Sequence, residues 1–134
     1  MSTHLIDANV LIDVIDSSQP DHAASARLVA ELIDDGVAAV NQIIYAEVLA
    51  GLDSEAEFAV VFDEDELQRL DLPWKAAWPA GQAHARYRTL KGSKRSPMPD
   101  FYIGAHAEVQ GLTIVTRDAT RYRTYFPAVE VVTP

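Results

Sequence analysis

The sequence has 134 residues, of which 49% are hydrophobic and 23% charged, values typical of a globular fold. This length predicts a single domain over residues 1–134. The absence of cysteine excludes disulfide bonds, thiolate metal sites and cysteine nucleophiles. No apolar run is long enough to cross a membrane, and the N-terminus carries no export signal, so we expect a cytoplasmic protein with no membrane partner.

The net charge of −9 is distributed unevenly between the two halves of the chain. Residues 1–71 contain 16 acidic and two basic residues, a net charge of −14. Residues 72–134 contain nine basic and four acidic residues, a net charge of +5. The overall acidity argues against a nucleic-acid partner, but the asymmetry predicts a local basic surface, and such a surface decides local attraction.

Short apolar runs alternate with amphipathic segments along the chain. In order, the pattern predicts a strand at 3–6, a helix at 8–15, a helix from 20 to 36, a strand at 37–40 and a helix at 41–51. It then predicts a helix at 54–62, a strand at 70–72, a basic helix at 79–90, a loop at 92–99, a helix at 99–111, and strands at 113–116 and 129–132. This alternation predicts an α/β fold with a mainly parallel central sheet flanked by helices.

Two acidic residues follow predicted strands. Asp7 comes directly after the first strand, and Asp118 comes two residues after the strand at 113–116. In parallel α/β sheets, ligands bind beyond the carboxyl ends of the strands. Each residue also has an ordinary explanation, because Asp7 can cap the next helix and Asp118 can belong to a turn.

Two further acidic residues lie on predicted helices. Glu47 shares a helical face with apolar and small residues, so it must be paired, bound to a metal ion or near the edge of the core; a salt bridge is the ordinary explanation. Asp100 lies in the first turn of its helix, where the helix dipole alone would favour it. The small residues that follow it, Gly104 among them, would let this helix approach the sheet and bring Asp100 toward the strand ends.

Gathering these carboxylates would require a counter-charge. At 5 Å and an effective dielectric of 20, each pair of like charges costs about 3 kcal/mol, and three pairs cost roughly 10 kcal/mol. Some of the acids must therefore stay protonated, or a cation must neutralise them. Oxygen ligands suit Mg²⁺ or Mn²⁺, and the four histidines show no zinc-ligand spacing. His106 is expected to be a helix-surface or core residue.

Four segments carry a recognisable pattern, namely LIDANVLID, YAEVLAG, PMPDFYIGAHAEVQGLTIVTRD and RYRTYFP. In this order and spacing they resemble the successive motifs of PIN domains, in particular those of the VapC-type toxins of bacterial toxin–antitoxin pairs. The resemblance runs from Thr3 to about Pro134, although residues 53–96 contribute little to it. By similarity, the four family acids fall on Asp7, Glu47, Asp100 and Asp118, and two supporting polar positions fall on Asn9 and Thr116.

The resemblance implies a three-layer PIN-like fold and an endoribonuclease that hydrolyses RNA phosphodiester bonds with one or two Mg²⁺ or Mn²⁺ ions. Asp7 and Asp100 would be the principal metal ligands, and Glu47 and Asp118 would complete the shell directly or through water. The resemblance also implies a small antitoxin protein as partner and a homodimer.

A basic segment follows in the second half of the chain. Its members are Arg86, Arg88, Lys91, Lys94 and Arg95. They either form an ordinary solvated face or a phosphate-binding rim for RNA beside the acidic pocket. Tyr87, Tyr102 and Tyr122 could stack on bases, but packing in the protein is the preferred interpretation. For Trp74 and Trp78, one helical turn apart, we expect core or dimer packing.

Two alternative functions stay open. Asp7-Ala8-Asn9 resembles the D-x-D motif of haloacid-dehalogenase-like phosphatases, in which the first Asp is the nucleophile. Asn9 replaces the second acid, however, and no convincing Thr and Lys motifs follow. The chain could also be a non-catalytic PIN-like binding domain; loss of an acid would favour that interpretation, yet all four are present.

Overall fold

The structure, a computed structural model, describes residues 2–91 and 97–134. A five-stranded parallel sheet forms its centre, with the strand order β3-β2-β1-β4-β5. The strands are β1 (His4–Ile6), β2 (Ala38–Val40), β3 (Gln68–Arg69), β4 (Thr113–Val115) and β5 (Val131–Val132). The helices are α1 (Ala8–Ile15), α2 (His22–Asp34), α3 (Gln42–Leu49), α4 (Glu55–Val61), the 3₁₀ turn η1 (Trp74–Ala76), α5 (Ala77–Lys91), α6 (Met98–Gln110) and α7 (Ala119–Tyr125). The predicted three-layer α/β fold with a parallel sheet is confirmed.

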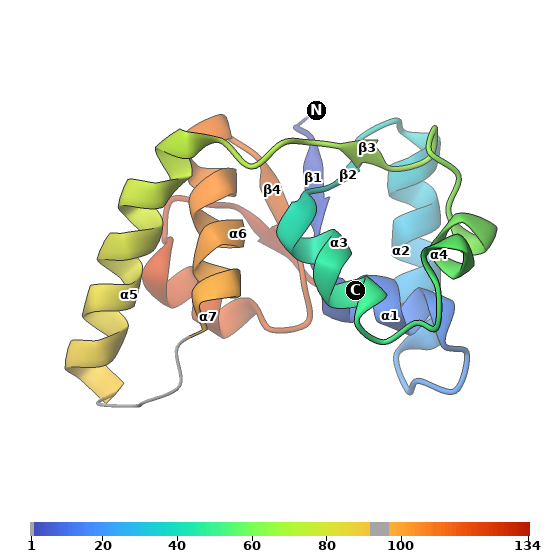
Figure 1. The fold of residues 1–134 in the computed structure, drawn as a ribbon, viewed down its shortest axis with the longest axis horizontal. Helices are drawn as coiled ribbons and strands as arrows, with labels where there is room; N and C mark the ends of the chain where they lie inside the picture. The colour runs from blue at the N-terminus through green and yellow to red at the C-terminus, as the bar shows by residue number, and fades with distance from the viewer. Residues whose placement is uncertain (1, 92–96) are drawn as a thin grey trace.

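The sheet lies between two groups of helices. In Figure 1, β1, β2 and β4 occupy the middle of the molecule, with α5 and α6 on one side and α2 and α4 on the other. The central strand β1 pairs with β2 on one side and with β4 on the other. The chain order therefore reverses at β1, and such a reversal is where the loops beyond the strands leave room for a ligand.

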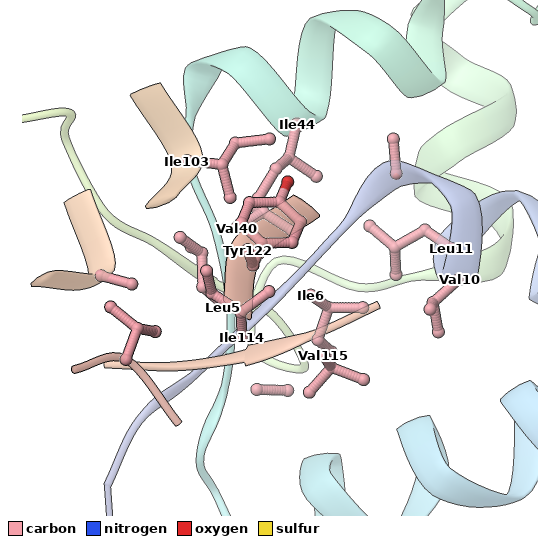
Figure 2. Close-up of a cluster of buried hydrophobic side chains, with 14 of the residues drawn as sticks. Leu5, Ile6, Val10, Leu11, Val40, Ile44, Ile103, Ile114, Val115 and Tyr122 are labelled. Carbon is pink, nitrogen blue, oxygen red and sulfur yellow. The ribbon is translucent and has the colours of Figure 1, made fainter. Parts of the chain in front are cut away.

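The core consists of apolar side chains from the sheet and from helices on both of its sides. Figure 2 shows Leu5 and Ile6 of β1 together with Ile114 of β4, and Tyr122 of α7 in the same cluster. All four side chains are fully buried. The strands β2 and β4 are buried along their whole length, as expected where both faces of the sheet are covered.

Two glycines have specific conformational roles. Gly36 ends α2 with a positive φ of 71°, and Gly111 ends α6 with a φ of 65°, a conformation that glycine adopts without strain. Gly104 is required for a different reason, since a Cβ atom at this position would lie 2.3 Å from two ring carbons of Phe126. The close packing expected of α6 at Gly104 is therefore a contact with the ring of Phe126.

The sequence prediction was wrong at two places. The strand expected at 70–72 lies earlier, at Gln68–Arg69, and both of its residues are exposed, so no apolar pattern marked it. Helix α7 was not predicted, because ATRYRTY is short and polar. It forms because Ala119, Tyr122 and Tyr125 bury one face in the core.

The expected core packing of the two tryptophans was also wrong. Trp74 is 95% exposed and Trp78 is 75% exposed. Trp74 borders an open pocket of about 430 Å³ whose other walls include Ile43, Leu72 and Tyr102. Dimer packing of these residues stays a prediction. Among the described helices, none combines the length and apolar character that crossing a bilayer requires.

Candidate active site

Asp7 lies at the carboxyl end of the central strand, where it begins α1. Its side chain is 5% exposed, and Oδ1 accepts a hydrogen bond of 2.8 Å from the amide of Ala8. Asp7 is therefore the helix cap that the sequence allowed. Its second oxygen remains for other partners.

Thr116 stands beside Asp7 because β1 and β4 are neighbours in register. Ile6 pairs with Val115, so the residues after these two strands lie next to each other. The Thr116 hydroxyl donates a hydrogen bond of 2.9 Å to Asp7 Oδ2. Asn9 joins this pair, since its Nδ2 donates to Thr116 Oγ1 at 3.2 Å and its Oδ1 accepts from the amide of Arg117 at 3.2 Å. The structure thus brings Asp7, Asn9 and Thr116 together.

Tyr122 completes the surroundings of Asp7 from α7. Its hydroxyl donates to Asp7 Oδ2 at 3.1 Å, and its ring is fully buried. Burial raises the pKa of Tyr122 well above its ordinary value, and the nearby charges of Asp7 and Asp100 act in the same direction. The hydroxyl therefore stays a neutral donor, and the ring is not free to stack on a base.

Asp7 carries its negative charge at a cost. Burial raises the pKa of its carboxyl, and the charge of Asp100 raises it further, while the hydrogen bonds from Thr116, Ala8 and Tyr122 lower it. The net direction is upward. The three donors thus offset only part of the penalty for burying this carboxylate.

Glu47 lies on α3 at the exposed edge of the same region. Loss of water around its carboxyl, followed by the charges of Asp7 and Asp100, raises the pKa of Glu47 to about 7. Both charges act on Glu47 because α1, α3 and α6 converge at this edge of the sheet. Asp7, Glu47 and Asp100 therefore form one electrostatically coupled group, which we call the acid cluster.

Asp100 and Asp118 share a cation, Arg121. The Arg121 guanidinium pairs with Asp100 Oδ2 and lies 3.8 Å from Asp118 Oδ2. The Asp118 side chain is 52% exposed and that of Asp100 is 22% exposed. Partial burial lowers the pKa of Arg121, but the hydrogen bond and charge of Asp100 and the charge of Asp118 outweigh this effect and raise it. Asp118 thus lies at the more exposed edge of the site and shares this guanidinium with Asp100.

The acid cluster offers the oxygen atoms that a hard divalent cation prefers. Within residues 2–91 and 97–134, no three acidic or histidine side chains surround a common point closely enough to hold a metal ion as they stand. Burial is the largest cause of the raised pKa values of Asp7 and Glu47, and the charges of neighbouring carboxylates raise both further. A cation would remove this repulsion. The donor set therefore fits Mg²⁺ or Mn²⁺ in its chemistry.

A second ion pair anchors the loop that carries Thr116. Arg117 Nε donates to Asp13 Oδ2 at 2.8 Å and its second nitrogen donates to Asp13 Oδ1 at 3.2 Å. Asp13 is fully buried on α1 and also accepts from Ser25 Oγ at 2.8 Å. This bidentate pair joins α1, α2 and the loop after β4, and so holds Thr116 beside Asp7.

Of the two positions expected for His106, the helix surface or the core, the structure has the core. Its Nδ1 lies 3.0 Å from Asn41 Nδ2 and its Nε2 lies 2.9 Å from Gln110 Oε1. Burial lowers the pKa of His106, so the neutral ring accepts from Asn41 and donates to Gln110. Asn41 in turn caps α3 through the amide of Ile44.

The predicted basic segment is described only in part. Arg86 makes contacts within the fold. Its guanidinium donates to the Tyr125 carbonyl at 3.1 Å, and its Cζ lies 5.3 Å from the centre of the Tyr125 ring. Arg88 is exposed on α5. Lys94 and Arg95 lie outside the described residues, as does the side chain of Lys91. RNA binding by this segment stays a prediction that Arg88 can test.

Sequence reasoning missed three residues of the site region, Asp13, Arg117 and Arg121. An acid inside the apolar run VLIDVI is a signal for a buried ion pair, since charged residues are almost never buried alone. The spacing of three between Asp118 and Arg121 on one helix indicates that these two can meet. Nothing in the sequence pattern shows that Arg121 also reaches Asp100 on α6.

The arrangement of acids, hydroxyl donors and parallel strands is matched by a known family. The model of the PIN domain matches residues 4–127. The chain belongs to the PIN domain family. No curated protein sequence matches this PIN domain significantly.

Solved structures of similar fold cover nearly the whole PIN domain. A chain of VapBC2 from Rickettsia felis, bound to promoter DNA, has a TM-score of 0.72 at 17% identity, and 98% of each chain is covered. A chain of DNA-bound VapBC from Salmonella typhimurium has a TM-score of 0.70 at 25% identity, with 99% of this chain and 98% of that chain covered. A chain of a toxin–antitoxin complex from Klebsiella pneumoniae has a TM-score of 0.62 at 23% identity, with 98% of each covered.

Proposed function

We propose that this PIN domain is a metal-dependent endoribonuclease, the toxin of a toxin–antitoxin pair. Asp7, Glu47 and Asp100 would hold Mg²⁺ or Mn²⁺, and Asp118 would contribute from the edge, directly or through water. The reaction would be hydrolysis of RNA phosphodiester bonds in the cytoplasm.

One observation carries this proposal. Partial burial of the Glu47 carboxyl, and then the charges of Asp7 and Asp100, raise the pKa of Glu47 to about 7. A protein gains nothing in stability by gathering three carboxylates that repel one another, so such a cluster favours a functional explanation. A divalent cation is the ligand that turns this repulsion into binding energy.

The chain's own residues would prepare the site in two ways. Thr116 Oγ1 and Tyr122 Oη donate to Asp7 Oδ2, so this carboxylate is held in one orientation before any ligand arrives. The Asp13–Arg117 pair fixes the loop that supplies Thr116. When bound, the metal ion would polarise the scissile phosphate and lower the pKa of an attacking water.

The toxin assignment is supported by the similar structures. One of them is a toxin–antitoxin complex, matched over 98% of both chains. We extend this to the present protein as a proposal, with a small antitoxin protein as its partner. A homodimer is proposed on the same basis, and the exposed Trp74 and Trp78 offer apolar surface for it.

The alternative functions explain less of the site. A phosphatase of the haloacid-dehalogenase type would need an acid at the second position of its motif. Here that position is Asn9, whose side chain hydrogen-bonds to Thr116 and to the amide of Arg117. A non-catalytic PIN-like binding domain would need no coupled acids. It remains the second candidate because Arg121 already neutralises Asp100.

A cleavage assay with controlled metal content tests the proposal. The full-length protein, freed of any antitoxin and stripped with EDTA, should leave a mixed set of single-stranded RNAs intact. Addition of Mg²⁺ or Mn²⁺ should restore cutting at defined positions, and Ca²⁺ should compete. Full cleavage in metal-free buffer would contradict the metal mechanism, and intact RNA under every condition would favour the binding domain.

A further inference from the structure

Arg121 links two acidic residues of the candidate site. It reaches from α7 to Asp100 on α6, and it also lies 3.8 Å from Asp118 on its own helix. Its side chain is 34% exposed, and it borders an open pocket of about 340 Å³ together with Tyr87 and Thr124. The guanidinium is thus a positive charge that the protein itself provides next to the acid cluster.

The carboxylate that Arg121 pairs with is the one that couples the cluster. Asp100 raises the pKa of both Asp7 and Glu47, so its charge reaches the whole group. An arginine bound to this carboxylate supplies part of the counter-charge that a divalent cation would supply. A guanidinium and a divalent cation on one carboxylate repel each other, so the two cannot both bind there at full strength.

Building on the proposed function, we propose that Arg121 is a built-in counter-cation that competes with the divalent metal ion for Asp100. In the metal-free protein the guanidinium neutralises Asp100 and keeps it from closing around a cation with Asp7 and Glu47. Loading of the site then requires the release of Arg121 from Asp100. Arg121 thereby sets the metal affinity of the site, and it is a positioning residue because it acts through Asp100.

An ordinary structural salt bridge makes a different prediction. Partly exposed ion pairs contribute little to stability, so a purely structural pair predicts no larger change in metal affinity than the loss of any other positive charge on α7. Arg123 lies on the same helix and is exposed; among the described residues it makes no ion pair. It therefore serves as the matched control for removing one positive charge from α7.

Calorimetric titration of Mn²⁺ into the full-length protein without RNA tests the proposal. Arg121→Gln should bind Mn²⁺ at least about fivefold more tightly than the unchanged protein, because a competing charge has been removed from contact distance. Arg123→Gln should change the affinity by less than about twofold, because solvent screens an exposed charge. Circular dichroism checks that each variant folds. If Arg121→Gln does not fold, Arg121→Met is titrated in its place.

The double variant Arg121→Gln/Asp100→Asn shows whether the gain acts through Asp100. Asp100→Asn alone is its reference, because both variants lack this proposed metal ligand; adding Arg121→Gln to Asp100→Asn should change the Mn²⁺ affinity by less than about twofold, since the competition needs the carboxylate. Equal or weaker Mn²⁺ binding by Arg121→Gln, with binding by the unchanged protein intact, would overturn the role of Arg121 and leave the proposed function standing. Failure of both proteins to bind Mn²⁺ would overturn the competition and the metal mechanism together, whereas binding by Arg121→Gln alone would support both.

Discussion

The hydroxyl of Tyr122 donates a hydrogen bond of 3.1 Å to Oδ2 of Asp7, although 115 positions separate these residues in the chain. The bond links the last helix of the fold to the end of the central strand. Thr116 donates to the same oxygen at 2.9 Å. The orientation of the Asp7 carboxylate therefore depends on the docking of α7 and on the loop after β4.

The first prediction concerns this hydrogen bond. Tyr122→Phe should keep the packing of the ring but leave the buried Asp7 carboxylate with one donor fewer, so the free energy of unfolding should fall by about 1–2 kcal/mol. Tyr45→Phe is the matched control, because its hydroxyl donates to Glu55 at the surface, and it should cost less than about 0.5 kcal/mol. Urea denaturation at pH 7 without metal measures both. Equal losses of unfolding free energy in the two variants would show that the Tyr122 hydroxyl stabilises the fold no more than a surface hydroxyl does.

The second prediction follows from the pKa of Glu47, which is raised from 4.5 to about 7. Folding disfavours the ionised form, so the unchanged protein loses stability from this group as the pH rises from 4.5 to 7 and no further above it. Glu47→Gln carries no charge and escapes this loss. In EDTA, we expect its stability advantage to be absent near pH 4, to grow up to pH 7, and to stay at no more than about 1 kcal/mol after solvent screening is allowed for.

Thermal melting between pH 4 and 8 measures this difference. A gap between the two melting curves that does not change with pH would mean that neither burial nor the neighbouring acids raise the pKa of Glu47. Added Mg²⁺ should reverse the order of stability at pH 7 to 8, because the metal binds the native state of the unchanged protein better.

The third prediction concerns the contact between α6 and Phe126. A methyl group at Gly104 would lie 2.3 Å from ring carbons of Phe126, so Gly104→Ala should lower the free energy of unfolding by about 1–3 kcal/mol. Gly81→Ala on α5 has open space around it and should instead be neutral or stabilising, by up to about 1 kcal/mol. If both variants were equally stable, the close approach of α6 would not be a constraint.

The fourth prediction separates the two arginines of α5. Arg88→Glu should weaken RNA binding and reduce the slope of log affinity against log salt by about 0.7 or more, the value for one phosphate contact on a single strand. Its stability should not change, because Arg88 is exposed. Arg27→Glu, exposed on α2, is the control and should leave the salt slope unchanged. Arg86 is unsuitable for this test because it holds the end of α7.

Part of the site could be predicted because strand ends are visible in the sequence. An acid directly after an apolar run places Asp7 at the end of β1. The strand predicted at 113–116 ends at Thr116, whose place in the site came from the family resemblance. The sheet register then brings them together, as the parallel fold requires. The positions of the acids on α3 and α6 needed the family motifs, since a helix alone does not show which of its faces meets the sheet.

The remaining features depend on tertiary contacts that no local pattern encodes. Helix α7 is a short polar segment whose helical form comes from burying Tyr122 and Tyr125. Arg121 has a partner within its own helix, Asp118, and its pairing with Asp100 depends on how α6 and α7 meet. The packing expected of Trp74 failed for the opposite reason, because an apolar residue need not be buried in the chain that carries it.

Cleavage by Asp100→Asn tests the proposed active site most directly. Asn preserves the shape of the side chain, but it removes the charge that a divalent cation requires. It also ends the ion pair with Arg121 and relieves the repulsion on Asp7 and Glu47, so the two effects offset each other and stability without metal should change by less than about 1 kcal/mol. Asp16→Asn on the exposed loop after α1 is purified in parallel as the control.

With Mg²⁺ and a single-stranded RNA substrate, we expect Asp16→Asn to cleave like the unchanged protein. Asp100→Asn should be folded, with a cleavage rate lower by about 100-fold or more, equivalent to a loss of about 2.7 kcal/mol of transition-state stabilisation. A folded Asp100→Asn protein that cleaves RNA at the rate of the unchanged protein would contradict the assignment of this site.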